Sequence, residues 1–219
     1  MSEDLHPAPV SGAWDSALLG PVAEINEQML ECLRAMAVEA AATDATDAGG
    51  AAPRLVTQLC QDWRRLDAKA QRRLSACPCL LLDAGFAQPQ RWELMAAPSV
   101  MDATVRRGYF SGRGGVALVR RTLVLAWHLA RSNRVSARVI LGMSALSAER
   151  IANARLADLE ALAELAPGWI VPRWEAQPNV WRQLIAAACR GQPLLLRQAQ
   201  LRGLQLLARA AGGRREGDG

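Results

Sequence analysis

The sequence has few of the residue types that proteins use for catalysis. Its 219 residues include only two histidines, His6 near the N-terminus and His128 within an apolar run. Histidine is the commonest acid–base group and metal ligand near neutral pH, and His128 is expected to be a packed core residue. No serine–histidine–carboxylate set and no acidic pair in a catalytic context can be recognised. The sequence therefore favours a protein that binds macromolecules over an enzyme, with no cofactor.

Disulfide and metal chemistry also have little support. The five cysteines are an odd number, and the N-terminal residues 1–10 lack the basic and then apolar layout of an export signal. Cys77 and Cys79 are separated by one residue, whereas a zinc knuckle uses two to four. These features predict reduced thiols, no metal site and a cytoplasmic location. Arginine interrupts every apolar run before it reaches a membrane-spanning length, so no membrane span is expected.

Lysine is nearly absent, because Lys69 is the only one among 26 basic residues. Codon bias toward arginine explains this, and so does selection for guanidinium groups that bind phosphates or carboxylates. Both explanations remain open. The formal net charge of +5 permits a nucleic acid or an acidic protein as partner and requires neither.

Helical periodicity is what the sequence has in abundance. Apolar residues, mainly Leu, Ala, Val and Ile, recur every three to four positions, which predicts an all-α fold. Trp63 and Trp127 lie within such apolar stripes and are expected to be buried anchors. Residues 169–174 are the one stretch where a short strand is expected. The predicted helices cover residues 21–36, 54–74, 88–95, 116–131, 135–141, 144–153, 156–165, 178–190 and 193–210.

Glycine, proline and polar clusters predict the domain organisation. The run 43–53 is rich in Ala, Asp, Thr and Gly and is expected to be a linker within the N-terminal half. The Gly/Arg-rich run 106–115 is the clearest break and is expected to be an exposed hinge between two halves. The predicted divisions are a flexible tail at 1–20, an irregular N-terminal helical region at 21–105, the linker at 106–115, a compact C-terminal helical domain at 116–210 and a disordered tail at 211–219.

One segment resembles a known family. The pattern covers about residues 117–185 and consists of Leu125-Ala126, Ala137, Leu141-Gly142-Met143-Ser144, Ala148, Ile151-Ala152, Leu156, Leu159, Leu162-Ala163 and Arg173-Trp174. It is similar to the central segment of the flagellar transcriptional activator FlhD family. The resemblance implies an all-α subunit that forms a dimer and contacts DNA together with a partner subunit.

Two groups of arginines are the candidate nucleic-acid contacts. Residues 137–165 loosely match a helix-turn-helix, and Arg138, Arg150 and Arg155 flank it. The Gly-rich run offers a second group, which could contact phosphates through side chains and backbone N–H groups. The alternative is that these arginines only solubilise a helical surface. The second group consists of Arg106, Arg107 and Arg113.

The expected function is that of a regulatory or adaptor protein similar to an FlhD-type regulator. It would act through contacts with a protein partner subunit, with DNA as a further candidate ligand and a homodimer as a compatible state. The alternative is an accessory factor or chaperone of a secretion or motility apparatus with no DNA role. A basic stripe on the surface would favour the regulator, and an uncharged apolar groove would favour the accessory factor. A deep pocket with converging polar groups would favour an enzyme.

Overall fold

The computed structural model describes residues 16–42, 52–93, 109–110 and 113–212. These ranges contain eleven α-helices, one 3₁₀ turn and a single pair of two-residue strands. The all-α prediction is confirmed. The predictions made for residues 1–15, 43–51, 94–108, 111–112 and 213–219, which include most of the tails and linkers, lie outside the described residues. None of the helices in the described ranges combines the length and hydropathy needed to cross a bilayer.

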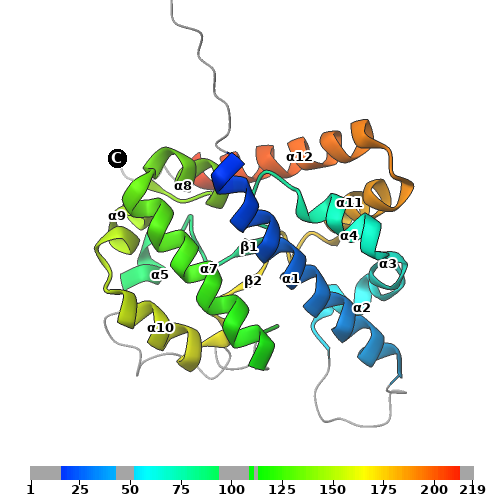
Figure 1. Ribbon diagram of the computed structural model, residues 1–219, viewed down its shortest axis with the longest axis horizontal. Coiled ribbons are helices and arrows are strands. Elements are labelled where there is room, and N and C mark those ends of the chain that lie inside the picture. The colour runs from blue at the N-terminus through cyan, green and yellow to red at the C-terminus, as the bar shows by residue number, and fades with distance from the viewer. Residues whose placement is uncertain (1–15, 43–51, 94–108, 111–112, 213–219) are drawn as a thin grey trace, which may run out of the picture.

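The elements follow one another as helices with short connections (Figure 1). In chain order they are α1 (Ser16–Ala42), α2 (Arg54–Gln58), α3 (Cys60–Arg65), α4 (Ala68–Ser75), β1 (Leu82–Asp83), α5 (Pro89–Glu93), α7 (Arg113–Ser132), α8 (Arg134–Leu141), α9 (Ala145–Asn153), α10 (Leu156–Leu165), the 3₁₀ turn η3 (Pro167–Trp169), β2 (Val171–Pro172), α11 (Pro178–Arg190) and α12 (Pro193–Gly212).

The helix predicted over 54–74 is instead three short helices. Its apolar stripe, including Leu59, Leu66 and Leu74, is buried as a helical period requires. The backbone leaves the helical region at Leu66, with ψ of 91°, and Asp67 begins a new helix by accepting a hydrogen bond from the Ala70 N–H. An aspartate at an N-cap satisfies an otherwise unpaired donor. The breaks were missed because the period of the stripe continues through them.

A single core links the two halves of the chain. Helix α1 packs on α3 and α4 on one side and on α7 on the other. Figure 1 shows α1 and α7 running next to each other through the middle of the molecule. The hydrophobic cluster extends from Val22 to Leu207, across the boundary expected at 106–115. Within that expected hinge, Tyr109 and Phe110 are buried, and Gly115 lies too close to the Phe110 carbonyl to carry a Cβ.

Two buried polar side chains fasten the extended segment after α4. The Asn26 amide donates to the carbonyls of Ser75 and Cys79 and accepts from the Leu81 N–H. The Arg173 guanidinium donates to the carbonyl oxygens of Leu80, Leu82 and Leu141 at 2.7–3.0 Å. Three of the guanidinium N–H groups are thereby paired, which offsets part of the cost of burying the charge. β1 pairs antiparallel with β2, so the strand expected at 169–174 is confirmed for two residues.

Helix α11 is anchored in this core. Trp181 is fully buried, with its ring centroid 5.3 Å from that of Trp63, and its indole N–H donates to the Arg173 carbonyl at 2.6 Å. At the other end of the helix, the Arg73 guanidinium donates twice to the Ala188 carbonyl, at 2.6 and 2.9 Å. Such a cation compensates the unpaired carbonyls of a helix C-terminus. α11 is thus fixed at both ends, and α12 folds back along it (Figure 1).

The side chains of Trp63, Trp127 and His128 differ in how deeply they are buried. Trp63 is buried, as predicted. Trp127 is only partly buried, so that prediction is wrong: its indole N–H reaches the Ala154 carbonyl at 2.9 Å, and the Arg131 guanidinium lies 4.6 Å from its ring centroid. His128 was predicted to be packed in the core and is exposed. Both residues lie at the margin of the apolar stripe, where periodicity is a poor guide to burial.

Candidate functional site

The predicted nucleic-acid contacts fall on separate elements. Arg138 is exposed on α8, whereas Arg150 on α9 forms an ion pair with Glu93 of α5. Arg155, which directly precedes α10, donates twice to the Asp158 carboxylate, at 2.7 and 2.9 Å. Two of these three arginines are therefore neutralised within the molecule. Of the second group, Arg106 and Arg107 lie outside the described residues, and Arg113 is the first residue of α7.

The helical turn itself is present. α8 ends at Gly142, whose φ of 66° is the left-handed conformation that glycine adopts readily, and the Ser144 hydroxyl caps α9 by accepting from the Ser147 N–H. The side chains that α9 exposes are Ala145, Leu146, Glu149 and Asn153. A carboxylate on the second helix repels phosphates. DNA binding by this unit stays a prediction, and the exposed face of α9 does not supply basic contacts for it.

A second basic surface lies on the hairpin formed by α11 and α12. Residues 178–212 contain five arginines and no Asp or Glu, so the rest of the chain holds 21 basic and 21 acidic residues. The formal charge of this hairpin is therefore +5. A count of charges along the sequence finds this acid-free stretch, and also a second one at 103–148 that holds eight arginines. The five arginines of the hairpin are Arg182, Arg190, Arg197, Arg202 and Arg209.

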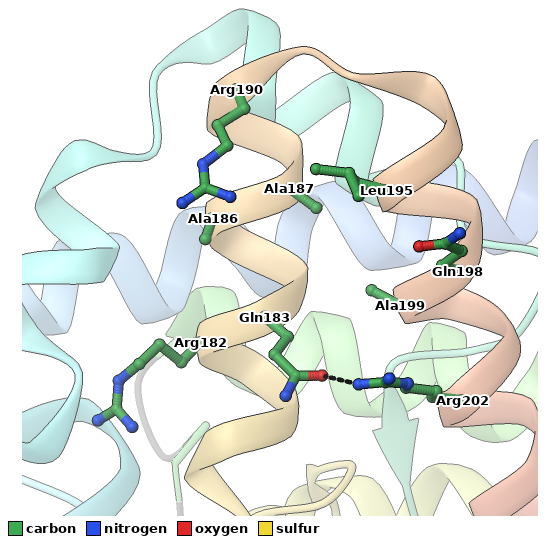
Figure 2. A pocket seen from close by; sticks show the side chains of 9 residues that line it. All are labelled: Arg182, Gln183, Ala186, Ala187, Arg190, Leu195, Gln198, Ala199 and Arg202. Atoms are coloured by element: carbon green, nitrogen blue, oxygen red, sulfur yellow. Dashed lines mark hydrogen bonds between the residues drawn. The ribbon is translucent and has the colours of Figure 1, made fainter.

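A surface groove of about 320 Å³ runs between the two helices (Figure 2). α11 contributes Arg182, Gln183, Ala186, Ala187 and Arg190, and α12 contributes Leu195, Gln198, Ala199 and Arg202. A second hollow of about 290 Å³ shares three of these residues, Gln183, Ala199 and Arg202. Because of the shared residues, the two hollows form one groove, which we call the hairpin groove. The second hollow adds Asn179, Val180, Gln205, Leu206 and Arg209.

Two of the four arginines that line the groove contact side-chain amides, and one of these two also lies near a carboxylate. The Arg202 guanidinium donates to the Gln183 side-chain oxygen at 3.2 Å, as Figure 2 shows. Arg182 donates to the Asn179 amide oxygen at 2.6 Å, and its Nε lies 3.7 Å from a carboxylate oxygen of Asp62. Neither Arg190 nor Arg202 has an ion pair within the described ranges. The groove therefore keeps most of its positive charge available to an external group.

The floor of the hairpin groove is small and apolar. Ala186, Ala187 and Ala199 line it, with Leu195 at one end. Outside the groove lining, α12 also exposes Leu194 and Leu201, which are 76% and 51% accessible. An apolar floor between cationic edges can remove apolar surface from water while the edges bind anions. This combination suits macromolecular recognition.

The buried thiols offer no alternative site. The Sγ atoms of Cys77 and Cys79 are 3.5 Å apart in the core. Their shared hydrogen bond raises the pKa of the Cys77 thiol well above its usual range and lowers the pKa of the Cys79 thiol. Both side chains are buried, so neither thiol is accessible from the surface. Across the ranges that the structure describes, no three His, Cys, Asp or Glu side chains gather closely enough to hold a metal ion.

Comparison with known proteins does not identify a function for this site. The chain matches no protein-family model, and neither a curated protein nor a solved structure is detectably similar to it.

Proposed function

We propose that this chain is a regulatory or adaptor protein that acts by binding a protein partner through the hairpin groove. The observation that carries the proposal is a helical hairpin with five arginines and no Asp or Glu, which surround an open groove with an apolar floor. Specific interfaces combine an apolar centre with charged edges in this way. In this proposal the protein acts in the cytoplasm, and α1 to α10 form the scaffold that presents the hairpin.

The groove chemistry supports binding and no reaction. Its lining consists of Arg, Gln, Asn, Ala, Val and Leu. Nucleophilic and acid–base catalysis need groups such as Ser, Cys, His, Asp, Glu, Lys or Tyr, and none of these types lines it. The arginines can orient an anion but cannot accept a proton. We therefore propose a non-enzymatic role.

A protein partner suits the hairpin better than a nucleic acid. Single strands bind where exposed aromatic rings stack on bases, yet Trp181, the one aromatic residue of α11 and α12, is fully buried. The exposed Leu194 and Leu201 need an apolar counterpart, which the phosphate backbone of a duplex lacks. Charge alone would suit either ligand, and the leucines and alanines favour a protein.

A second candidate is a DNA-binding regulator of the FlhD type, favoured by the family-like pattern over 117–185 and by the unpaired positive charge of the hairpin. A third is an accessory factor of a secretion or motility apparatus, favoured by the apolar floor. All three share a protein partner and differ in whether DNA joins the complex.

The proposal is tested by affinity purification of the full chain from its own cells. Three forms are compared: wild type, R190E/R202E in the groove, and R54E/R134E as a control with the same change of charge at exposed positions outside it. We expect the groove variant to lose specific partners that wild type and control both retain. Retention of the same partners by all three forms would overturn the proposal. Nuclease treatment of each sample separates direct partners from those bridged by DNA.

A further inference from the structure

Resting on the proposed function, we infer that the hairpin groove binds an acidic amphipathic helix of the partner protein. This helix would pack against α11 and α12 as the third member of a helical bundle. The inference follows from the length of the groove, the helical spacing of its lining and the sign of its charge.

The groove has the length of a short helix. Its lining extends from Asn179 to Arg190 on α11 and from Leu195 to Arg209 on α12. At a rise of 1.5 Å per residue these stretches are about 16 and about 21 Å long. A partner helix of about 11 to 14 residues fills that length. Amphipathic helices of this size commonly bind by laying one face into such a groove.

The lining of α12 has the spacing of a helix face that packs against another helix. Its members recur three or four residues apart from Leu195 to Arg209. This is the period of a helix stripe, here with Leu195, Ala199 and Leu206 as apolar members. The opposite wall holds Ala186 and Ala187. Small side chains on the floor allow the close approach of a further helix, at an interaxial distance of about 8–10 Å.

The positive charge of the groove indicates that the bound helix carries acidic side chains. On the α11 edge, Arg182 and Arg190 are eight residues apart, and on the α12 edge Arg202 and Arg209 are seven apart. Both intervals are about two helical turns. Asp or Glu side chains at two-turn spacing on both flanks of a bound helix would face these arginines. A carboxylate would also displace Gln183 from Arg202, because charge-assisted hydrogen bonds are stronger than neutral ones.

The test uses three labelled synthetic peptides of 16 residues, each helical and with one Leu/Ala face. The flanking positions carry Glu in the first peptide, Gln in the second and Lys in the third. Fluorescence anisotropy with the full wild-type chain should show the Glu peptide binding at least tenfold more tightly than the other two. For R190E/R202E, affinity for the Glu peptide should fall at least tenfold, while the Lys peptide should gain affinity. R54E/R134E should behave as wild type.

A second variant tests the apolar floor. Ala186→Phe fills the groove without changing charge, and should weaken the Glu peptide at least tenfold. Circular dichroism melting of every variant is the control for folding. We expect the fold to be retained, since Arg190, Arg202 and Ala186 all have exposed or half-buried side chains.

Several results would overturn the inference. They are the absence of Glu-peptide binding, equal binding of all three peptides, or tighter binding of duplex DNA than of the Glu peptide with the same dependence on Arg190 and Arg202. A wild-type dimer that R190E/R202E converts to a monomer in sedimentation would assign the groove to a second copy instead. If cellular partners depend on the groove arginines but the Glu peptide fails to bind, the adaptor function stands and the helical occupant is wrong.

Discussion

Arginines in the region α7 to α10 and arginines in the hairpin α11–α12 have different surroundings. In the first region, Arg120 lies 2.7 Å from a Glu164 oxygen, and Arg121, Arg150 and Arg155 each have a carboxylate partner as well. In the hairpin, Arg182 alone approaches a carboxylate within the described residues. Residues 113–165 hold eight arginines and four Asp or Glu residues, so the first region is basic as well. It differs from the hairpin in that half of its arginines lie next to a carboxylate. The hairpin has no Asp or Glu of its own, so an acidic partner of the kind proposed would balance its charge. Charge counts in the sequence find both basic regions, whereas the carboxylate partners that distinguish them appear only in the structure.

The largest loss of stability is expected for a substitution where the hairpin joins the core. Trp181→Ala should lower the free energy of unfolding by about 3–5 kcal/mol, because the indole is fully buried between other tryptophans and donates to the Arg173 carbonyl. Trp127→Ala should cost clearly less, since that ring is partly exposed. Urea denaturation followed by circular dichroism measures both. Equal losses would mean that the hairpin is not anchored as described.

Gly203 tests the packing of α12 itself. In most helices Gly→Ala is stabilising, but a Cβ at Gly203 would lie 2.6 Å from the Trp174 ring. Gly203→Ala should therefore destabilise the protein, by about 1–3 kcal/mol. Thermal or urea unfolding measures the change. An increase in stability would show that α12 packs farther from Trp174 than the structure indicates.

Added salt should weaken peptide binding at the hairpin groove and leave the stability of the fold nearly unchanged. In the proposed function, partner binding at the hairpin groove would depend on arginines at the surface. Screening strengthens as the Debye length falls from about 10 Å at 0.1 M salt to about 3 Å at 1 M. Affinity for an acidic peptide should fall with added NaCl, while the melting temperature of the free protein stays nearly constant. Affinity that is independent of salt would mean that the apolar floor alone drives binding.

A smaller change is expected in how the melting temperature depends on pH when Asp67 is replaced. The N–H of Ala70 lowers the pKa of the Asp67 carboxyl, because it donates to the charged form. The contribution of Asp67 to stability is therefore complete above its unfolded-state pKa and is lost as pH falls through the lowered folded-state value. Asp67→Asn should flatten the acid side of a plot of melting temperature against pH. A curve identical to that of wild type would contradict the capping role.

The smallest effect is expected at Arg155. Its ion pair with Asp158 is on the surface, and exposed pairs contribute little to stability. Arg155→Gln should leave both the melting temperature and the affinity for the partner unchanged. A loss of DNA or partner binding on this substitution would return the functional site to the region around α9 and α10.

The sequence allowed the prediction of most helices but not of their assembly. The helix predicted at 178–190 is α11, residue for residue, because Pro178 begins it and Gly191 ends it with φ of 65°. The breaks within 54–74 could not be predicted, since the buried stripe from Leu59 to Leu74 keeps its period. The groove could not be predicted from the sequence, because periodicity does not reveal which faces of α11 and α12 leave a gap between them.

The most direct test of the account is a nuclear magnetic resonance titration of the full chain with the Glu-flanked peptide. The account predicts that amide shift changes concentrate in α11 and α12, around Arg190, Ala199 and Arg202, and disappear in R190E/R202E. Changes centred on α8 and α9 around Arg138, or changes that persist in that variant, would contradict it.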